Sequence, residues 1–304
     1  MGSMNTVRVN AYSKLNLTLD ITGAEGGFHT LDSVVVTVDL SDRVVLSGRK
    51  DGLISVSMHG MGSESIPPEE NNAQRAGEAF MARFGTAGAN VKIFKNIPIG
   101  AGMGGSSADA AGVLLGLAKL YGISDMVALK ELADSIGSDT GYLLSGGFAR
   151  LRGRGEQVEK LGPPPDWRFL VVCPKSGVST AECYREYDRL QSAREPRTER
   201  FLMTLRENPA WAPRLFGNDL GMAAASLNSH VADALAALKA LSPLGASVTG
   251  SGSAVFALFE TGELCEWAKS RYQGKGRVYT VKCVDPAKIK KWRNPYALEE
   301  MEGK

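Results

Sequence analysis

Apolar positions in the first third of the chain recur mainly with the period of a β-strand. Residues 7–12 and 34–40 are rich in β-branched residues, residues 54–58 alternate apolar side chains with serines, and residues 91–94 form a further short apolar run. One stretch differs, because apolar residues at positions 73, 76, 80 and 84 share one face of a helix. The pattern predicts a strand-rich region with a helix over about residues 72–84, capped by Asn71 or Asn72.

The rest of the chain alternates between the two periods. A helix is expected directly after the glycine-rich stretch, where residues 111, 114, 115 and 118 share one apolar face. Further helices are expected over about residues 125–136, through residues 231–241 and over about residues 263–272. Strands are expected at residues 148–151, 169–173, 254–259 and 278–284. Three consecutive prolines at positions 163–165 can continue neither a sheet nor a helix. The pattern therefore predicts two α+β domains, residues 1–165 and residues 166–304.

Composition narrows the class of protein mainly by exclusion. A net charge of +2 gives no reason to expect nucleic acid or an anionic membrane surface as a partner. No apolar run approaches the roughly 20 residues of a membrane span, and the amino-terminal stretch has no signal-peptide pattern. The four cysteines are scattered without a C-x-x-C pair, so neither a zinc cage nor a disulfide framework is expected. We expect a cytoplasmic location.

The clearest chemical signal is a glycine- and serine-rich segment at residues 98–112, which reads PIGAGMGGSSADAAG. Glycines let backbone N–H groups approach an anion without a Cβ in the way. The helix that follows adds unpaired N–H donors and a positive dipole end. Ser106 and Ser107 can donate hydroxyl groups to a phosphate or help to hold Mg²⁺. The segment predicts a nucleotide phosphate site, and its alternative is a tight turn that only packs against a neighbour.

Three common nucleotide-binding motifs do not fit this segment. Gly100, Gly102 and Gly105 match G-x-G-x-x-G, but a second helix follows where the dinucleotide fold requires a parallel strand that ends in an acid. No lysine follows the glycines, as a P-loop requires. None of the three histidines lies in the H-R-D triplet of protein kinases.

Two charged residues are candidates for phosphoryl transfer. Lys14 and Asn16 lie on one face of the first strand, between leucines, which favours a polar floor over a solvated edge. Asp139 follows the predicted helix at 125–136. A carboxylate can take the proton of an acceptor hydroxyl, and a nearby lysine would keep that carboxylate ionised. The alternatives are a surface lysine and a turn aspartate, and the spacing does not show whether the two side chains meet.

Two further segments could belong to the same site. Residues 249–253, TGSGS, form a second glycine-serine turn that could brace the phosphate loop. Phe28 or Tyr184 could stack on a base, and His29 could hydrogen-bond the edge of that base. Spacing alone favours core aromatics and a loop histidine.

Taken in order, these motifs resemble those of the GHMP small-molecule kinases. The matching segments are residues 11–17, 27–31, 98–109, 137–139, 146–156, 218–220 and 249–253. The resemblance implies a two-domain α+β fold, with an N-terminal mixed α/β domain and a C-terminal ferredoxin-like α+β domain.

The resemblance also implies roles for individual residues. Lys14 and Asp139 would be catalytic, ATP would be the phosphoryl donor and Mg²⁺ would sit on its phosphates. The motifs are most similar to the branch of the family whose acceptor carries a cytidine diphosphate moiety, and the implied reaction phosphorylates the 2-hydroxyl of a methylerythritol unit. The ATP site would comprise Asn71, on the adenine side, and the loop residues Pro98, Ile99, Gly100, Ala101, Gly102, Met103, Gly104, Gly105, Ser106, Ser107 and Ala108. The acceptor site would comprise Asn16, Phe28, His29, Thr180 and Tyr184.

The chain departs from the family pattern at several positions, including Phe28 in place of tyrosine and a charged segment at 190–215, and three alternative functions remain. Thr140, Gly141 and Tyr142 stand where the family has Val-Pro-Phe, which predicts a flexible turn directly after the proposed base. The chain could instead be a GHMP kinase for a mevalonate-type or sugar-like alcohol, a nicotinamide-dependent oxidoreductase, or a nucleotide-binding regulator without catalysis. We expect a monomer or a weak homodimer.

Overall fold

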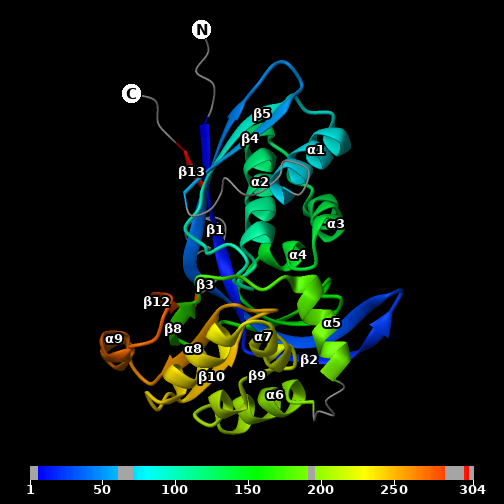
Figure 1. Cartoon of the computed structure of the whole chain (residues 1–304). Coiled ribbons are helices and arrows are strands. Elements are labelled where there is room, and N and C mark those ends of the chain that lie inside the picture. The colour runs from blue at the N-terminus through cyan, green and yellow to red at the C-terminus, as the bar shows by residue number, and fades with distance from the viewer. Residues whose placement is uncertain (1–5, 61–70, 191–195, 285–297, 301–304) are drawn as a thin grey trace.

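A computed structural model describes residues 6–60, 71–190, 196–284 and 298–300, the last of these as backbone only (Figure 1). The amino-terminal residues 1–5, to which part of the signal-peptide expectation refers, lie outside these ranges. The larger sheet contains β1 (Thr6–Asn16), β2 (Thr18–Glu25), β3 (Phe28–Gly48), β4 (Ile54–His59), β5 (Ala89–Phe94), β6 (Phe148–Gly153), β7 (Gln157–Gly162), β9 (Gly217–Asn218) and β13 (Leu298–Glu300). The smaller sheet contains β8 (Arg168–Cys173), β10 (Gly245–Val248), β11 (Val255–Phe259) and β12 (Arg277–Lys282).

The helices divide between the two sheets. Those of the first half are α1 (Asn72–Phe84), α2 (Gly105–Tyr121), α3 (Met126–Ile136) and the single turn α4 (Thr140–Leu143). Those of the second half are α5 (Thr180–Leu190), α6 (Thr198–Glu207), α7 (Gly221–Leu227), α8 (Ser229–Lys239) and α9 (Gly262–Arg271), with a 3₁₀ turn at Ala212–Leu215. The predicted helices at 72–84 and 125–136 are confirmed to within one residue. No helix in the described ranges is long and apolar enough to cross a membrane.

The long strand β3 organises the larger sheet, because it pairs along its 21 residues with β1, β2, β5 and β6. Its antiparallel register with β1 shifts between Tyr12 and Lys14. Buried and half-buried residues alternate along β1 up to this irregularity, and residues 13–16 after it are all buried. A register shift re-aims the side chains that follow it, which places Lys14 and Asn16 inside the molecule.

The smaller sheet has the strand order β10-β11-β8-β12, with every pair antiparallel. If these four strands are numbered 1 to 4 in chain order, starting from β8, their spatial order is 2-3-1-4. This is the strand order of a ferredoxin-like sheet. Along β8 the faces alternate: Phe169 and Val171 belong to the core of the larger sheet, whereas Leu170 and Val172 pack with the helices α7 to α9. The two sheets therefore share one hydrophobic core.

The boundary at residue 165 stays a prediction. Strands β1 to β7 all precede it and lie in the larger sheet, and β8, β10, β11 and β12 follow it and form the smaller one. The short strands β9 and β13, however, come from the second half and pair with β2 and β1.

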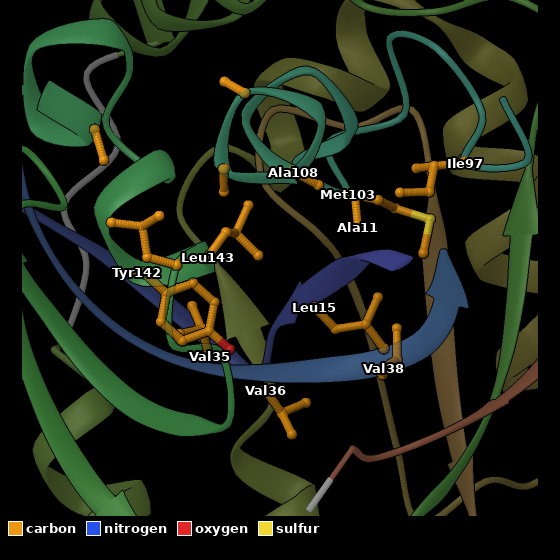
Figure 2. Packing of buried hydrophobic residues seen from close by; sticks show 14 of the residues in the cluster. Ala11, Leu15, Val35, Val36, Val38, Ile97, Met103, Ala108, Tyr142 and Leu143 are labelled. Atoms are coloured by element: carbon orange, nitrogen blue, oxygen red, sulfur yellow. The ribbon is translucent and has the colours of Figure 1, made fainter. Parts of the chain in front are cut away.

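Helix α2 carries the glycine segment and is anchored by small apolar residues that pack on β1 and β3. Figure 2 shows Met103 of the segment beside Ile97 and Ala11, with Ala108 nearby in the same core. Met103 and Ala108 are almost completely buried. The segment is therefore attached to the core at both ends, while the glycines between Ile99 and Met103 stay at the surface of the cavity described below.

The prediction of a flexible turn after Asp139 is wrong. Thr140 and Tyr142 are fully buried in the helical turn α4. The Tyr142 hydroxyl donates to the Gly147 carbonyl and is hydrogen-bonded to the Thr37 hydroxyl, with both distances 2.7 Å. A Cβ at Gly141 would overlap the carboxylate of Asp134 on α3, so the glycine serves a close approach of two helices and not a hinge.

Candidate active site

A cavity of about 370 Å³ lies where the glycine segment, β1, α5 and the turn at residues 249–253 meet. Its lining residues are Lys14, Asn16, Leu19, Leu31, Met58, Asn71, Lys95, residues 98–107, Asp109, Ser138, Asp139, Leu151, Arg154, Thr180, Tyr184, Leu220, Gly250 and Ser251. The fold thus gathers most of the residues singled out in the sequence. Of the predicted catalytic, ATP-site and acceptor-site residues, Phe28, His29 and Ala108 do not line the cavity.

The glycine segment is held by its carbonyl groups. The carbonyls of Gly100 and Ala101 accept from the N–H groups of residues 253 and 254, at 3.2 and 3.0 Å. The Gly102 carbonyl accepts from the Thr249 hydroxyl at 3.3 Å. The carbonyls of residues 103 and 104 accept from the backbone N–H groups of Lys14 at 3.0 Å and Ala108 at 2.8 Å. Within the described residues, no acceptor pairs with the N–H groups of residues 99–107. The five carbonyls of residues 100–104 are therefore hydrogen-bonded, whereas the backbone N–H groups of the segment remain available to bind an anion.

The turn at residues 249–253 braces the segment from the smaller sheet, as the sequence suggested. Gly102 has a φ of +71° and lies so close to this turn that a Cβ would overlap the Thr249 carbonyl oxygen. Gly100 has a similar φ of +67°, but the nearest atom to a Cβ there is the Gly177 Cα at 3.5 Å. Close packing therefore requires glycine at position 102, whereas backbone conformation alone favours glycine at position 100.

This difference predicts unequal effects for two alanine substitutions. Gly100→Ala should cost about 1–2 kcal/mol, because it adds only the left-handed backbone penalty. Gly102→Ala should cost more than about 3 kcal/mol, because the loop must also move away from the turn. Urea unfolding of the two variants beside the wild type measures both changes. Equal destabilisation would mean that the contact between the segment and the turn is not tight.

Lys14 and Asp139 meet in the cavity. The Lys14 Nζ lies 3.3 Å from the Asp139 Oδ2 and donates to the Asn16 Oδ1 at 2.5 Å. The lysine side chain is 4% exposed, whereas the aspartate side chain is 28% exposed and faces the cavity. The carboxylate therefore has an ammonium partner behind it and remains accessible to a bound molecule. The catalytic roles of the two residues stay a prediction.

Asn16 connects the three segments around this ion pair. Its Oδ1 accepts from the Lys14 ammonium and from the Gly250 N–H at 3.1 Å, and lies 3.3 Å from the Thr249 Oγ1, whose single proton it shares with the Gly102 carbonyl. Its Nδ2 donates to the Ser33 hydroxyl at 2.9 Å. This buried amide fixes the position of Lys14, and its own role in binding an acceptor stays a prediction.

Two of the predicted acceptor residues, Thr180 and Tyr184, line the cavity from α5. Thr180 begins α5 and is hydrogen-bonded to the Ser251 hydroxyl at 3.0 Å. Tyr184, one turn further along α5, lines the cavity, and burial raises the pKa of its phenol to about 12. The His29 ring stacks on the Tyr184 ring, with their centroids 4.8 Å apart. His29 is therefore placed beside the cavity through Tyr184.

Phe28 lies outside this arrangement. It stands at the tip of the β2–β3 hairpin, 56% exposed, and the Arg154 guanidinium covers its ring at 4.1 Å from the centroid. Arg154 itself lines the cavity. Asn71 lines the cavity from the amino end of α1, which it caps by accepting from the Ala73 N–H at 3.0 Å.

Sequence reasoning missed a buried ion cluster behind the glycine segment. The Lys95 ammonium bonds the carboxylates of Asp42 on β3 and Asp109 on α2, and all three side chains are at most 2% exposed. Burial raises the pKa of Asp109 well above its usual range, against the opposing effect of Lys95. Asp42 also accepts from the N–H groups of Asn96 and Ile97. The cluster ties the end of β5 to the second turn of α2.

Strand alternation carried a signal for Lys95. Val91 and Ile93 fall on the buried face of β5, and Lys95, directly after the end of the strand, continues their spacing of two residues. A charged residue at a core position predicts a buried partner. Ser138 and Arg154, which also line the cavity, lie in the matching segments 137–139 and 146–156, but no role was predicted for either residue.

Comparisons with known proteins place this architecture in a class. A family model described as the GHMP kinases N terminal domain matches residues 71–149, and one described as GHMP kinases C terminal matches residues 205–269. The first match contains the glycine segment and Asp139, and the second contains the turn at 249–253. The fold and the cavity define a small-molecule kinase of the GHMP type.

Individual relatives narrow the family. The chain is 35% identical over 267 residues to the 4-diphosphocytidyl-2-C-methyl-D-erythritol kinase of Pelotomaculum thermopropionicum, covering 86% of this chain and 92% of that protein. It is 34% identical over 289 residues to the kinase of the same name from Clostridium tetani, covering 91% and 100%. A crystal structure of 4-(cytidine 5'-diphospho)-2C-methyl-D-erythritol kinase matches with a TM-score of 0.75 and 30% identity, covering 90% of this chain and 98% of that one. The chain belongs to the family of 4-diphosphocytidyl-2-C-methyl-D-erythritol kinases.

Proposed function

We propose that this kinase transfers the γ-phosphoryl group of ATP to the 2-hydroxyl of 4-diphosphocytidyl-2-C-methyl-D-erythritol, in the synthesis of isoprenoid precursors. The observation that carries the proposal is the Lys14–Asp139 ion pair, 3.3 Å long, which faces a cavity whose wall is the glycine segment. Phosphoryl transfer needs an anion cradle for the donor and a carboxylate beside the acceptor hydroxyl. Family membership supports the choice of acceptor.

In the proposed reaction, Asp139 takes the proton of the acceptor hydroxyl as the oxygen attacks the γ-phosphorus, and the bond from that phosphorus to the β,γ-bridging oxygen breaks to release ADP. The ammonium of Lys14 keeps that carboxylate ionised and stabilises the negative charge on the attacking oxygen. The N–H groups of the glycine segment and the amino end of α2 bind the phosphates. Asn71 lies at the adenine end of the proposed nucleotide position.

Mg²⁺ fits the oxygen donors around this cradle. In the described part of the chain, no three His, Cys, Asp or Glu side chains gather as a metal cage. The hydroxyls of Ser106 and Ser107 in the first turn of α2 are hard oxygen donors of the kind that Mg²⁺ takes. Bound there with the nucleotide, the ion would neutralise charge on the phosphates.

The acceptor is proposed to bind along α5. Its cytosine would stack on the aromatic side chains of this region, Tyr184 and Phe28, and would be recognised through its edge by His29. Thr180 and Asn16 would contact the part of the acceptor nearer to Asp139. Burial of Tyr184 and its contact with His29 support this orientation.

We further propose that the enzyme acts in the cytoplasm as a monomer or a weak homodimer. One chain supplies all lining residues of the cavity described above, so a second copy is not needed to complete it. The four cysteines are free thiols.

A coupled assay for ADP formation with a panel of acceptors tests the reaction. The cytidine diphosphate compound should be turned over with a much higher kcat/KM than mevalonate, homoserine or a free sugar. Phosphorus NMR of the product should show a new phosphomonoester beside an intact diphosphate. Absence of turnover with the cytidine compound, under conditions where another alcohol reacts, would overturn the proposed acceptor and leave the kinase class in place.

A further inference from the structure

Asp188, on α5, holds the imidazole of His29 on β3. The Asp188 Oδ1 lies 2.7 Å from the His29 Nε2, which joins the hairpin at residues 28–29 to α5 across 159 positions of sequence. The His29 ring also stacks on Tyr184 and meets Tyr187 edge-on, with centroids 5.9 Å apart. Among the described residues, none is hydrogen-bonded to the His29 Nδ1. The ring is therefore held on three sides, and one nitrogen is left for a ligand.

The chemistry of the contact determines which nitrogen carries the proton. An ionised carboxylate only accepts hydrogen bonds, so the His29 Nε2 must donate to it. In a neutral imidazole the other nitrogen, Nδ1, is then an acceptor. Cytosine offers an amino group, a donor, at the position where uracil offers a carbonyl oxygen. A fixed Nδ1 acceptor therefore matches cytosine and repels uracil.

We infer that Asp188 is a positioning residue that fixes the tautomer of His29 and thereby selects cytosine over uracil in the acceptor. This inference rests on the proposed function for the identity of the acceptor. Asp188 does not line the cavity, so it acts through His29. Its side chain is 58% exposed on the surface of α5, which means that a substitution there removes the hydrogen bond without opening the core.

The test uses Asp188→Asn, which keeps the shape of the side chain but can donate as well as accept. If the amide donates to Nε2, the proton of His29 moves to Nδ1 and the preference for the base reverses. We expect the KM for the cytidine compound to rise about 10- to 100-fold, the range seen when an orienting partner is removed, with little change in kcat. The ratio of kcat/KM for the cytidine compound over its uridine analogue should fall. Asp188→Glu should restore part of that ratio.

A matched control is available on α8, where Asp233 lies 3.8 Å from the Nδ1 of His230. Asp233→Asn removes the same charge beside another histidine, away from the cavity, and should change neither KM nor the ratio between the two bases.

Nitrogen-15 NMR of the His29 imidazole provides a readout that needs no acceptor. The wild type should show the Nε2–H tautomer, and Asp188→Asn should lose it. A wild-type Nδ1–H tautomer would overturn the inference, as would an Asn variant that keeps the wild-type preference for the cytidine compound. If the enzyme phosphorylates no cytidine compound, the proposed function fails, and the NMR tautomer together with the affinities for free CDP and UDP still decides the role of Asp188.

Discussion

Replacing Asp139 with asparagine is expected to lower kcat by about 10²–10⁴-fold, the usual contribution of a positioned general base. Asparagine keeps the size of the side chain and can still hydrogen-bond Lys14, which lies 3.3 Å from the carboxylate in the wild type. It cannot take a proton from the acceptor hydroxyl. The KM values for ATP and the acceptor should change little, because the glycine segment and α5 are untouched. Steady-state kinetics in the coupled assay measures all three constants.

Asp125→Asn is the control for this substitution. Asp125 caps α3 by accepting from the Ala128 N–H at 3.0 Å, and asparagine caps a helix equally well. The variant should therefore keep wild-type kinetics and stability. A wild-type kcat for Asp139→Asn would show that the proton leaves by another path, even with the family assignment intact.

Replacing Lys95 with methionine is expected to destabilise the fold by about 3–5 kcal/mol, the effect of removing one partner from a buried ion pair. The substitution leaves the carboxylates of Asp42 and Asp109 facing each other in the core, with no cation between them. Although burial opposes it, the attraction of these two carboxylates raises the pKa of Lys95, which indicates that the lysine is bound as the ammonium ion. Urea denaturation followed by circular dichroism measures the change in the free energy of unfolding.

Lys92→Met provides the comparison, because Lys92 lies on the exposed face of β5, the strand that ends just before Lys95. It should change stability by no more than about 0.5 kcal/mol. Adding Asp42→Asn and Asp109→Asn to Lys95→Met should restore part of the lost stability, since the repelling charges are then gone. Equal stability of Lys95→Met and Lys92→Met would show that the cluster is not needed to hold α2 against β5.

Local patterns predicted those features that depend on residues close in sequence. The helix at 72–84 followed from four apolar positions at helical spacing, and its cap followed from Asn71. The phosphate segment was predicted because its glycines, serines and following helix are contiguous. The ferredoxin-like sheet was predicted only through the resemblance to a family, since strand order depends on contacts between distant segments.

Features that depend on two distant segments were harder to predict. From the sequence we predicted that Lys14 and Asp139 act together. The register shift in β1 that turns the lysine inward could not be predicted from the residue pattern. Gly141 suggested a flexible turn, but the presence of glycine at this position is explained by the close approach of α3. Phe28 was predicted to line the acceptor site, and its position at the exposed tip of a hairpin depends on the register of β2 and β3. That role stays a prediction.

The engaged carbonyls of residues 100–104 have a consequence for the entropy of nucleotide binding. When a loop must become ordered around its ligand, the lost conformational entropy opposes binding by about 1–2 kcal/mol for each residue that is fixed. Here the chain has already lost that freedom on folding, because residues from β1 and from the smaller sheet hold the loop in place. Affinity for phosphates should therefore be nearly independent of solvent conditions that alter loop disorder, and association should occur without a slow ordering step.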